Sequence, residues 1–216
     1  MNDDLITFTP TGFGYVNEDA RVVLVGITPG STQLQGDRIG KSSREIKREN
    51  AFAGGMRKNL VRMLDCIGIN GVLGISTCAT LWDDDFDKVE MTSLLKDATF
   101  YKGKMFNKAS AIFRSAKLTK ALNDGFANDC RKYTSAVAFV ALGYDVGLVL
   151  SKLKIDGVIH SEVITIPHPS WANAGRAAVF LGQKDALASD AAGLRAREQY
   201  KTAMKSTFGL SCRQDS

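Results

Sequence analysis

The chain has 216 residues, of which 44% are hydrophobic and 24% are charged, and its formal net charge is +5. This length and composition fit a single α/β domain with a sizeable core. No apolar run is long enough to span a membrane, so we expect no membrane partner. The first residues, Met-Asn-Asp-Asp-Leu, lack the basic and apolar regions of a signal peptide, so we expect a cytosolic protein. We also expect it to be a monomer.

The cysteines are scattered along the chain without Cys-x-x-Cys spacing, at Cys66, Cys78, Cys130 and Cys212. This distribution argues against a zinc site and indicates reduced thiols. We expect no metal and no cofactor. The acidic run at 83–87 is interpreted as a turn.

The first half of the chain begins with a polar stretch at 1–20, which we expect to be an arm of low order. The continuous apolar run at 22–25 predicts a strand buried on both faces, as in a parallel sheet. The segment 31–55 is long for a loop in a compact domain, and such loops are often functional. Within it, 42–48 predicts a helical turn, and an apolar stripe predicts a helix at 56–67.

Further along the chain, predicted strands alternate with predicted helices. Strands are predicted at 72–77, 136–142 and 163–166, and helices at 118–130, 146–153, 174–181 and 185–206. Residues 80–115 show no clear period. The alternation predicts an α/β protein with three layers, in which helices flank a central parallel sheet.

Two short motifs follow predicted strands. After 163–166, Pro167 and Pro169 bracket His168, so the imidazole lies on a stiff loop. The carboxyl ends of strands are where open α/β sheets bind ligands, although a loop histidine with only structural contacts is the alternative. After 22–25 comes Gly26-Ile27-Thr28-Pro29-Gly30, whose glycines permit close approach of the backbone to a ligand.

Together, Gly-x-Thr-Pro-Gly and His-Pro-Ser resemble the two signature motifs of the uracil-DNA glycosylase superfamily. Residues 51–64 are similar to the phenylalanine-glycine segment and following helix of its families four and five. Residues 137–143, ending in Leu-Gly, resemble their third strand. The resemblance implies a four-stranded sheet of order 2-1-3-4 and a DNA partner. The cysteine spacing departs from the iron–sulfur cluster of family four.

The resemblance also implies roles for individual residues. His168 would donate to the anion that develops on the departing base, and Phe52 would stack on the flipped base. The first motif would contact the base and position water through Gly26, Ile27, Pro29 and Gly30. Trp171 would form a wedge in the vacated stack, unless it is a partly buried core residue.

Two departures from the family pattern affect the expected substrate. Thr28 stands where many members carry an aspartate, asparagine or glutamate that orients water. It is a catalytic candidate because its hydroxyl can accept from water, although it is a weak base. Gly55 stands where family five has an aspartate. Asp37 could substitute as the catalytic carboxylate. At the end of the predicted second strand, Ser76 and Thr77 replace an asparagine that reads uracil. The pocket is therefore expected to accept another, bulkier base.

Basic residues gather in two segments, interleaved with aromatic side chains, which favours a phosphate-binding surface over solvated helix faces. The expected DNA contacts in the first segment are Arg44, Lys47 and Arg48. The second segment contains Lys102, Lys104, Lys108, Arg114, Lys117 and Lys120. Near the histidine motif, Ser170 and Asn173 are candidate helix caps and DNA contacts, and Arg176 would bind phosphate or form a salt bridge within its loop.

These observations lead to a monofunctional DNA glycosylase acting on a modified or deaminated base. A bulky pyrimidine of phage DNA would make it a defence protein, and uracil would make it an ordinary base excision repair enzyme. A non-catalytic nucleic-acid-binding module is a second class. A nucleotide-binding enzyme is the third, although the chain lacks the G-x-x-x-x-G-K-[ST] and G-x-G-x-x-G spacings.

Overall fold

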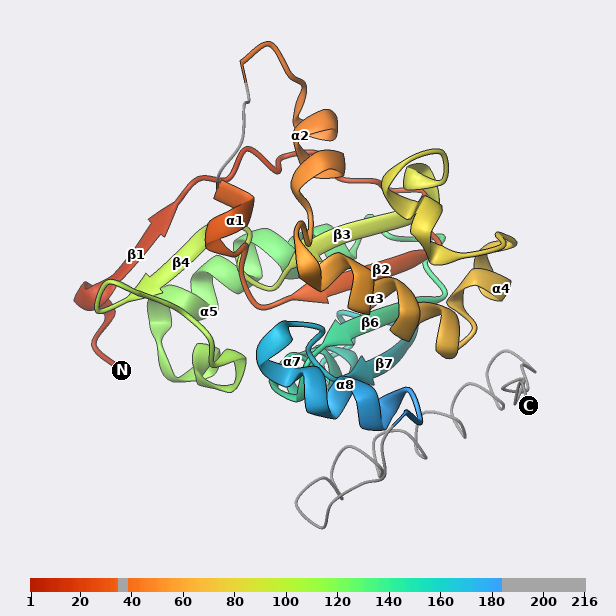
Figure 1. Ribbon diagram of the computed structural model, residues 1–216. Helices are drawn as coiled ribbons and strands as arrows, with labels where there is room; N and C mark the ends of the chain where they lie inside the picture. The colour runs from red at the N-terminus through yellow and green to blue at the C-terminus, as the bar shows by residue number, and fades with distance from the viewer. Residues whose placement is uncertain (35–38, 184–216) are drawn as a thin grey trace.

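The computed structural model describes residues 1–34 and 39–183 (Figure 1). Its centre is a four-stranded parallel sheet with the order β3-β2-β6-β7. The strands are β2 (Val22–Gly26), β3 (Val89–Ser93), β6 (Ala138–Leu142) and β7 (Glu162–Ile166). Every residue of β2, β3 and β6 is buried, as expected for strands covered on both faces. The predicted α/β class and parallel sheet are confirmed.

The predicted strand at 72–77 is wrong. The place beside β2 that this strand was expected to take is occupied by β3, which was not predicted. Residues 72 and 73 instead end a short helix, α4 (Ile69–Leu73), which is enclosed by Gly68 at φ 80° and Gly74 at φ 66°. These left-handed glycines end helices and interrupt a strand. The strand beside β2 is β3, which carries Glu90 as its second residue. A carboxylate is rare in a fully buried strand, which explains why the sequence did not indicate one there.

Helices cover both faces of the sheet (Figure 1). Alternate side chains of a strand point to opposite faces, so Val22 and Leu24 of β2 belong to one core and Val23 and Val25 to the other. The first core lies beneath α3 (Gly55–Cys66) and α8 (Ala174–Phe180). The second lies beneath α5 (Ala116–Leu122) and α7 (Tyr144–Ile155).

Residues 1–20 are structured, contrary to the prediction of an arm of low order. After a 3₁₀ turn, η1 (Asp3–Leu5), strand β1 (Ile6–Thr9) pairs antiparallel with β4 (Ala98–Tyr101), which pairs with β5 (Lys104–Met105). This small sheet forms because Ile6 is buried against the second core. Sequence patterning missed it since each of its strands is very short.

The remaining elements are short. They are α1 (Ser31–Leu34), α2 (Ser43–Asn50), α6 (Asn128–Cys130), the 3₁₀ turns η2 (Cys78–Trp82), η3 (Phe86–Lys88), η4 (Ala109–Arg114) and η6 (Trp171–Asn173), and the π-helical turn η5 (Asn123–Ala127). Helix α2 begins with a capping box formed by Ser42 and Glu45. The helix predicted at 185–206 lies outside the described residues. Within the described ranges, none of the helices is long and apolar enough to cross a membrane.

Candidate functional site

The candidate site lies at the carboxyl edge of the sheet, where β2 ends at Gly26 and β3 at Ser93. A β-carbon on Gly26 would lie 3.5 Å from the ring of Phe52 and 3.4 Å from Ser93 Oγ. Phe52 therefore lies directly against the end of β2, although it comes from the loop before α3. Its backbone φ is 52°, which is uncommon for a bulky side chain. The structure thus brings together Gly26 and Phe52, as expected.

His168 lies on the same edge, beside the end of β6. A β-carbon on Gly143 would lie 3.5 Å from His168 Cβ, and Gly143 has φ 111°. The Gly143 N–H donates to the Ile166 carbonyl at 2.8 Å, which fixes the two strand ends together. On the other side, Asn59 Nδ2 of α3 donates to the Pro169 carbonyl at 3.1 Å. The loop that carries His168 is therefore held by a strand and a helix as well as by its prolines.

The protonation of His168 follows from its contacts. Its Nδ1 accepts a hydrogen bond from the Ser170 N–H at 3.3 Å, so this nitrogen carries no proton. Burial lowers the pKa of the imidazole from its ordinary value, and the neutral form therefore predominates at pH 7. The remaining proton is on Nε2. Ser170 in turn accepts from Asn173 Nδ2 at 3.3 Å, so both residues support the loop.

A small cavity of about 20 Å³ adjoins Phe52 and has room for about one water molecule. Gln33 borders it and holds the first motif, since its Oε1 accepts from the Gly30 N–H at 2.7 Å. Among the described residues, its polar lining contains no carboxylate. The lining consists of Phe13, Pro29, Gln33, Lys47, Ala51, Phe52, Met91, Thr92, Ser93 and Lys96. A larger cavity of about 470 Å³ lies at the opposite edge, before β6 and β7.

Thr28 connects the first motif to the small sheet. Its hydroxyl donates to the Asp97 carbonyl at 2.8 Å and accepts from the Thr99 N–H at 2.9 Å. The single hydroxyl proton is thus engaged, and one lone pair is left to accept from water. Asp37, the other expected water-activating residue, lies outside the described residues.

Ser76 and Thr77 do not reach this site, so their expected role in base binding is wrong. Thr77 Oγ1 donates to Asp65 Oδ2 at 2.7 Å, in the last turn of α3, whereas Phe52 precedes the first turn. The helix between them places these residues roughly 15 Å apart along its axis. The positions at the true strand end are Thr92 and Ser93. They were missed because β3 was not predicted.

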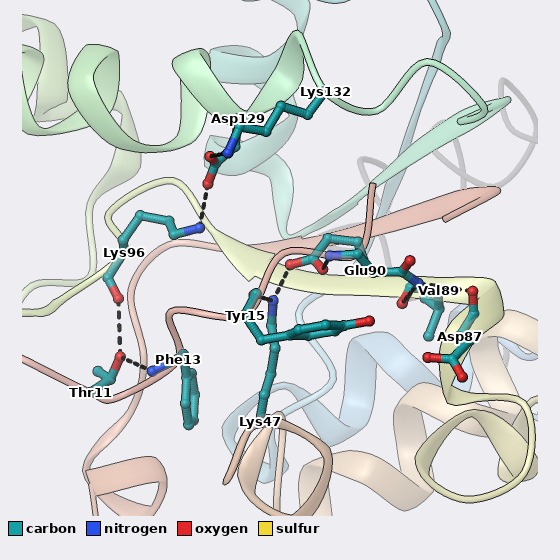
Figure 2. A network of polar contacts seen from close by, with 11 residues as sticks. Thr11, Phe13, Tyr15, Lys47, Asp87, Val89, Glu90, Lys96, Asp129 and Lys132 are labelled. Carbon is teal, nitrogen blue, oxygen red and sulfur yellow. Dashed lines mark hydrogen bonds and ion pairs between the residues drawn. The ribbon is translucent and has the colours of Figure 1, made fainter. Parts of the chain in front are cut away.

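Lys47 is buried and cannot contact DNA, contrary to expectation. Its side chain is 1% exposed, forms an ion pair with Glu90 and donates to the Tyr15 carbonyl at 2.6 Å (Figure 2). Burial lowers the pKa of Lys47 and raises the pKa of Glu90, because removal from water disfavours both charges. In α2 the buried residues are Ile46 and Lys47, so the position of Lys47 next to the apolar Ile46 could have indicated its burial.

The other expected DNA contacts differ in their availability. Arg44 forms an ion pair with Asp87 at 2.6 Å and lies over the Phe86 ring at 5.3 Å, so phosphate would have to compete with a carboxylate. Arg48 is half-buried, and Arg176 is exposed on α8. Trp171 begins η6, and its side chain lies outside the described part of the structure.

A scan against protein-family models found no match. The chain is similar to the uncharacterized protein YoxB of Bacillus subtilis (strain 168). The two sequences are 28% identical over 188 residues, which cover 80% of this chain and 73% of that protein. This relative has no assigned activity, so the chemistry rests on the geometry of the site.

Proposed function

We propose that the protein is a monofunctional DNA glycosylase that hydrolyses the N-glycosidic bond of a modified or deaminated base. The observation that carries this proposal is the setting of His168. The imidazole is neutral, its Nδ1 is occupied by the Ser170 N–H, and it lies against Gly143 at the end of β6. Gly26 and Phe52 meet at the end of β2, the neighbouring strand on the same edge of the sheet. A fixed, neutral N–H donor at this edge suits the stabilisation of an anion better than the transfer of a proton.

The chemistry requires such a donor. When the glycosidic bond breaks, negative charge develops on the departing base and positive charge on the sugar. The base must first leave the duplex or be presented in a single strand, because the stack shields the reacting carbon. In this proposal Phe52 contacts the face of the base, and His168 Nε2–H donates to the developing anion. Because the donor is held in place beforehand, little reorganisation is needed as the bond breaks.

The substrate that we propose is a base larger than uracil. Ser93, at the end of β3, takes the position that was expected for Ser76 or Thr77. We infer that this small side chain stands where members of the uracil-DNA glycosylase superfamily carry an asparagine. The cavity beside Phe52 holds about 20 Å³ in this conformation, so a base can enter only if the cavity enlarges. Bulky pyrimidines of phage DNA are candidate substrates, and the protein would then act in defence.

A non-catalytic module that binds flipped bases is a second candidate. It is favoured by the absence of a carboxylate among the described residues that line the cavity and by the engagement of the Thr28 proton. Both features weaken the activation of water. Excision therefore has to be measured directly.

The decisive experiment compares His168→Ala with His160→Ala on a panel of oligonucleotides that contain uracil or substituted pyrimidines. His160 is exposed and borders the cavity at the opposite edge, so it is a matched control. We expect His168→Ala to lower excision about 10²-fold or more, the scale of one lost donor to an oxyanion, and His160→Ala to leave it unchanged. Abasic sites are quantified by alkaline cleavage.

The panel separates the alternatives. Faster release of a substituted pyrimidine than of uracil supports the proposal that the substrate is a base larger than uracil. Preferred release of uracil identifies an ordinary repair enzyme. Oligonucleotide binding without excision of any base supports the non-catalytic module, and wild-type excision by His168→Ala shows that this histidine is structural.

A further inference from the structure

Helix α7 exposes apolar side chains that face solvent. Tyr144 is 72% exposed and Leu148 is 46% exposed, and their spacing of four residues places them on one helix face. Phe113 of η4 is 39% exposed and lies beside this face, since Lys152 Nζ of α7 is 5.7 Å from the centre of its ring. We call these exposed residues of η4 and α7 the η4–α7 face.

The η4–α7 face begins at the candidate site. Tyr144 directly follows Gly143, whose Cα lies against His168. The start of α7 is tied to η4 because Ser110 Oγ donates to Asp145 Oδ2 at 3.0 Å. A ligand that reaches His168 can therefore extend over Tyr144 without crossing the core.

Two cations flank the face and are available to a ligand. Lys108 precedes η4 and Arg114 ends it, and both are exposed. Neither forms an ion pair with another described residue. The α2 cluster differs, because Arg44 pairs with Asp87 and Lys47 is buried against Glu90.

We propose that the η4–α7 face binds single-stranded DNA next to the nucleotide held at His168. Exposed aromatic rings stack on bases whose faces are free, whereas a duplex covers those faces with neighbouring base pairs. Tyr144 would stack on a base, and Lys108 and Arg114 would bind phosphates. This inference rests on the proposed function, since it takes the strand to continue from the flipped base, and it adds a preference for single strands.

The test of stacking is the affinity for a fluorescein-labelled oligothymidine, measured by anisotropy with no excisable base present. We expect Tyr144→Ala to weaken binding roughly 5-fold to 150-fold, the range for one lost stacking contact. Tyr144→Phe keeps the ring and should bind like the wild type. Ile155→Ala removes an apolar side chain that is 84% exposed at the far end of the same helix, so it should have no effect.

The test of the cations is the salt dependence of the same binding. Lys108→Gln with Arg114→Gln should flatten the slope of log affinity against log salt by about 1.4, or roughly 0.7 for each phosphate contact to a single strand. Arg21→Gln with Arg131→Gln removes the same number of charges from exposed positions outside both basic segments and should leave the slope nearly unchanged. Thermal melting confirms that each variant is folded.

Equal affinity for duplex and single strand, together with an unaffected Tyr144→Ala, would overturn the proposal, as would the absence of binding. The excision panel is read separately. Binding that depends on Tyr144, without excision of any base, would refute the proposed glycosylase activity and support the η4–α7 face as a DNA-binding surface. Excision of a base, with no effect of Tyr144→Ala on binding, would support the glycosylase activity and refute the η4–α7 face as a DNA-binding surface.

Discussion

Replacement of Lys47 by Met should destabilise the protein strongly, because it leaves Glu90 buried without its cation. Both side chains are 1% exposed, and among the described residues Glu90 would keep one hydrogen bond, from the Asn17 N–H at 2.9 Å. Removal of one partner of a buried ion pair typically costs about 3–5 kcal/mol. For a chain of this length each kcal/mol corresponds to roughly 2–4 °C, so we expect the melting temperature to fall by about 10 °C.

The loss should depend on pH, and its sign follows from Glu90. Burial already raises the pKa of Glu90 in the folded protein, and loss of the Lys47 cation raises it further. A carboxyl with a raised folded pKa favours folding at pH values below its unfolded pKa, and this contribution is lost as the pH rises through the folded pKa. Lys47→Met should therefore be less destabilised at pH 5 than at pH 8, relative to the wild type.

The assay is urea denaturation at both pH values, in which unfolding is monitored by tryptophan fluorescence. Trp82 is a suitable probe because it is 5% exposed and its Nε1–H donates to the Ala51 carbonyl at 2.9 Å, just beyond α2. Arg48→Met is the matched control, since it changes the next, half-buried residue of the helix. A cost below about 1 kcal/mol for Lys47→Met, equal at both pH values, would refute the buried pair and return Lys47 to the surface.

Two further predictions concern contacts around the site. Thr28→Val removes the acceptor of the Thr99 N–H and the donor to the Asp97 carbonyl, so it should cost about 1–3 kcal/mol in thermal melting, whereas Thr28→Ser should cost little. A β-carbon on Gly147 would lie 2.2 Å from Thr165 Oγ1, so Gly147→Ala should cost about 1–3 kcal/mol through overpacking between α7 and β7. Thr165→Ala in the same chain should restore part of that loss, and no restoration would show that the strain lies elsewhere.

The regular part of the fold was predictable from apolar patterning. The strands at 22–25, 136–142 and 163–166 and the helices of α3, α7 and α8 lie close to their predicted positions, because burial sets their periodicity directly. Helix 118–130 is also present, although a π-helical turn interrupts it at Asn123–Ala127. The central error was β3. Its sequence, Val-Glu-Met-Thr-Ser, hides a buried strand because Glu90 is balanced by Lys47, which lies more than forty residues earlier in the chain.

The same error decided how much of the site could be predicted. His168 and Gly26 followed from short motifs at strand ends, and the structure places both on the carboxyl edge. Ser93 could not be identified, because its role depends on β3 lying beside β2. The burial of Lys47 depends on the same strand. Local motifs therefore identified the residues that belong to one loop, and failed where the site depends on pairing between distant segments.

If the protein acts on DNA as proposed, the distribution of paired charge favours one side of the site for the DNA to approach. Helix α2 lies over the end of the sheet that carries β3, whereas α7 lies against β6 and β7 (Figure 1). The sequence contained basic residues on both sides and did not distinguish them. On the α2 side, Lys47 stabilises a buried strand and Arg44 is paired with Asp87, so phosphate would have to displace a carboxylate. On the α7 side, Lys108 and Arg114 are exposed beside an aromatic surface, so a strand that enters at His168 is expected to leave along α7.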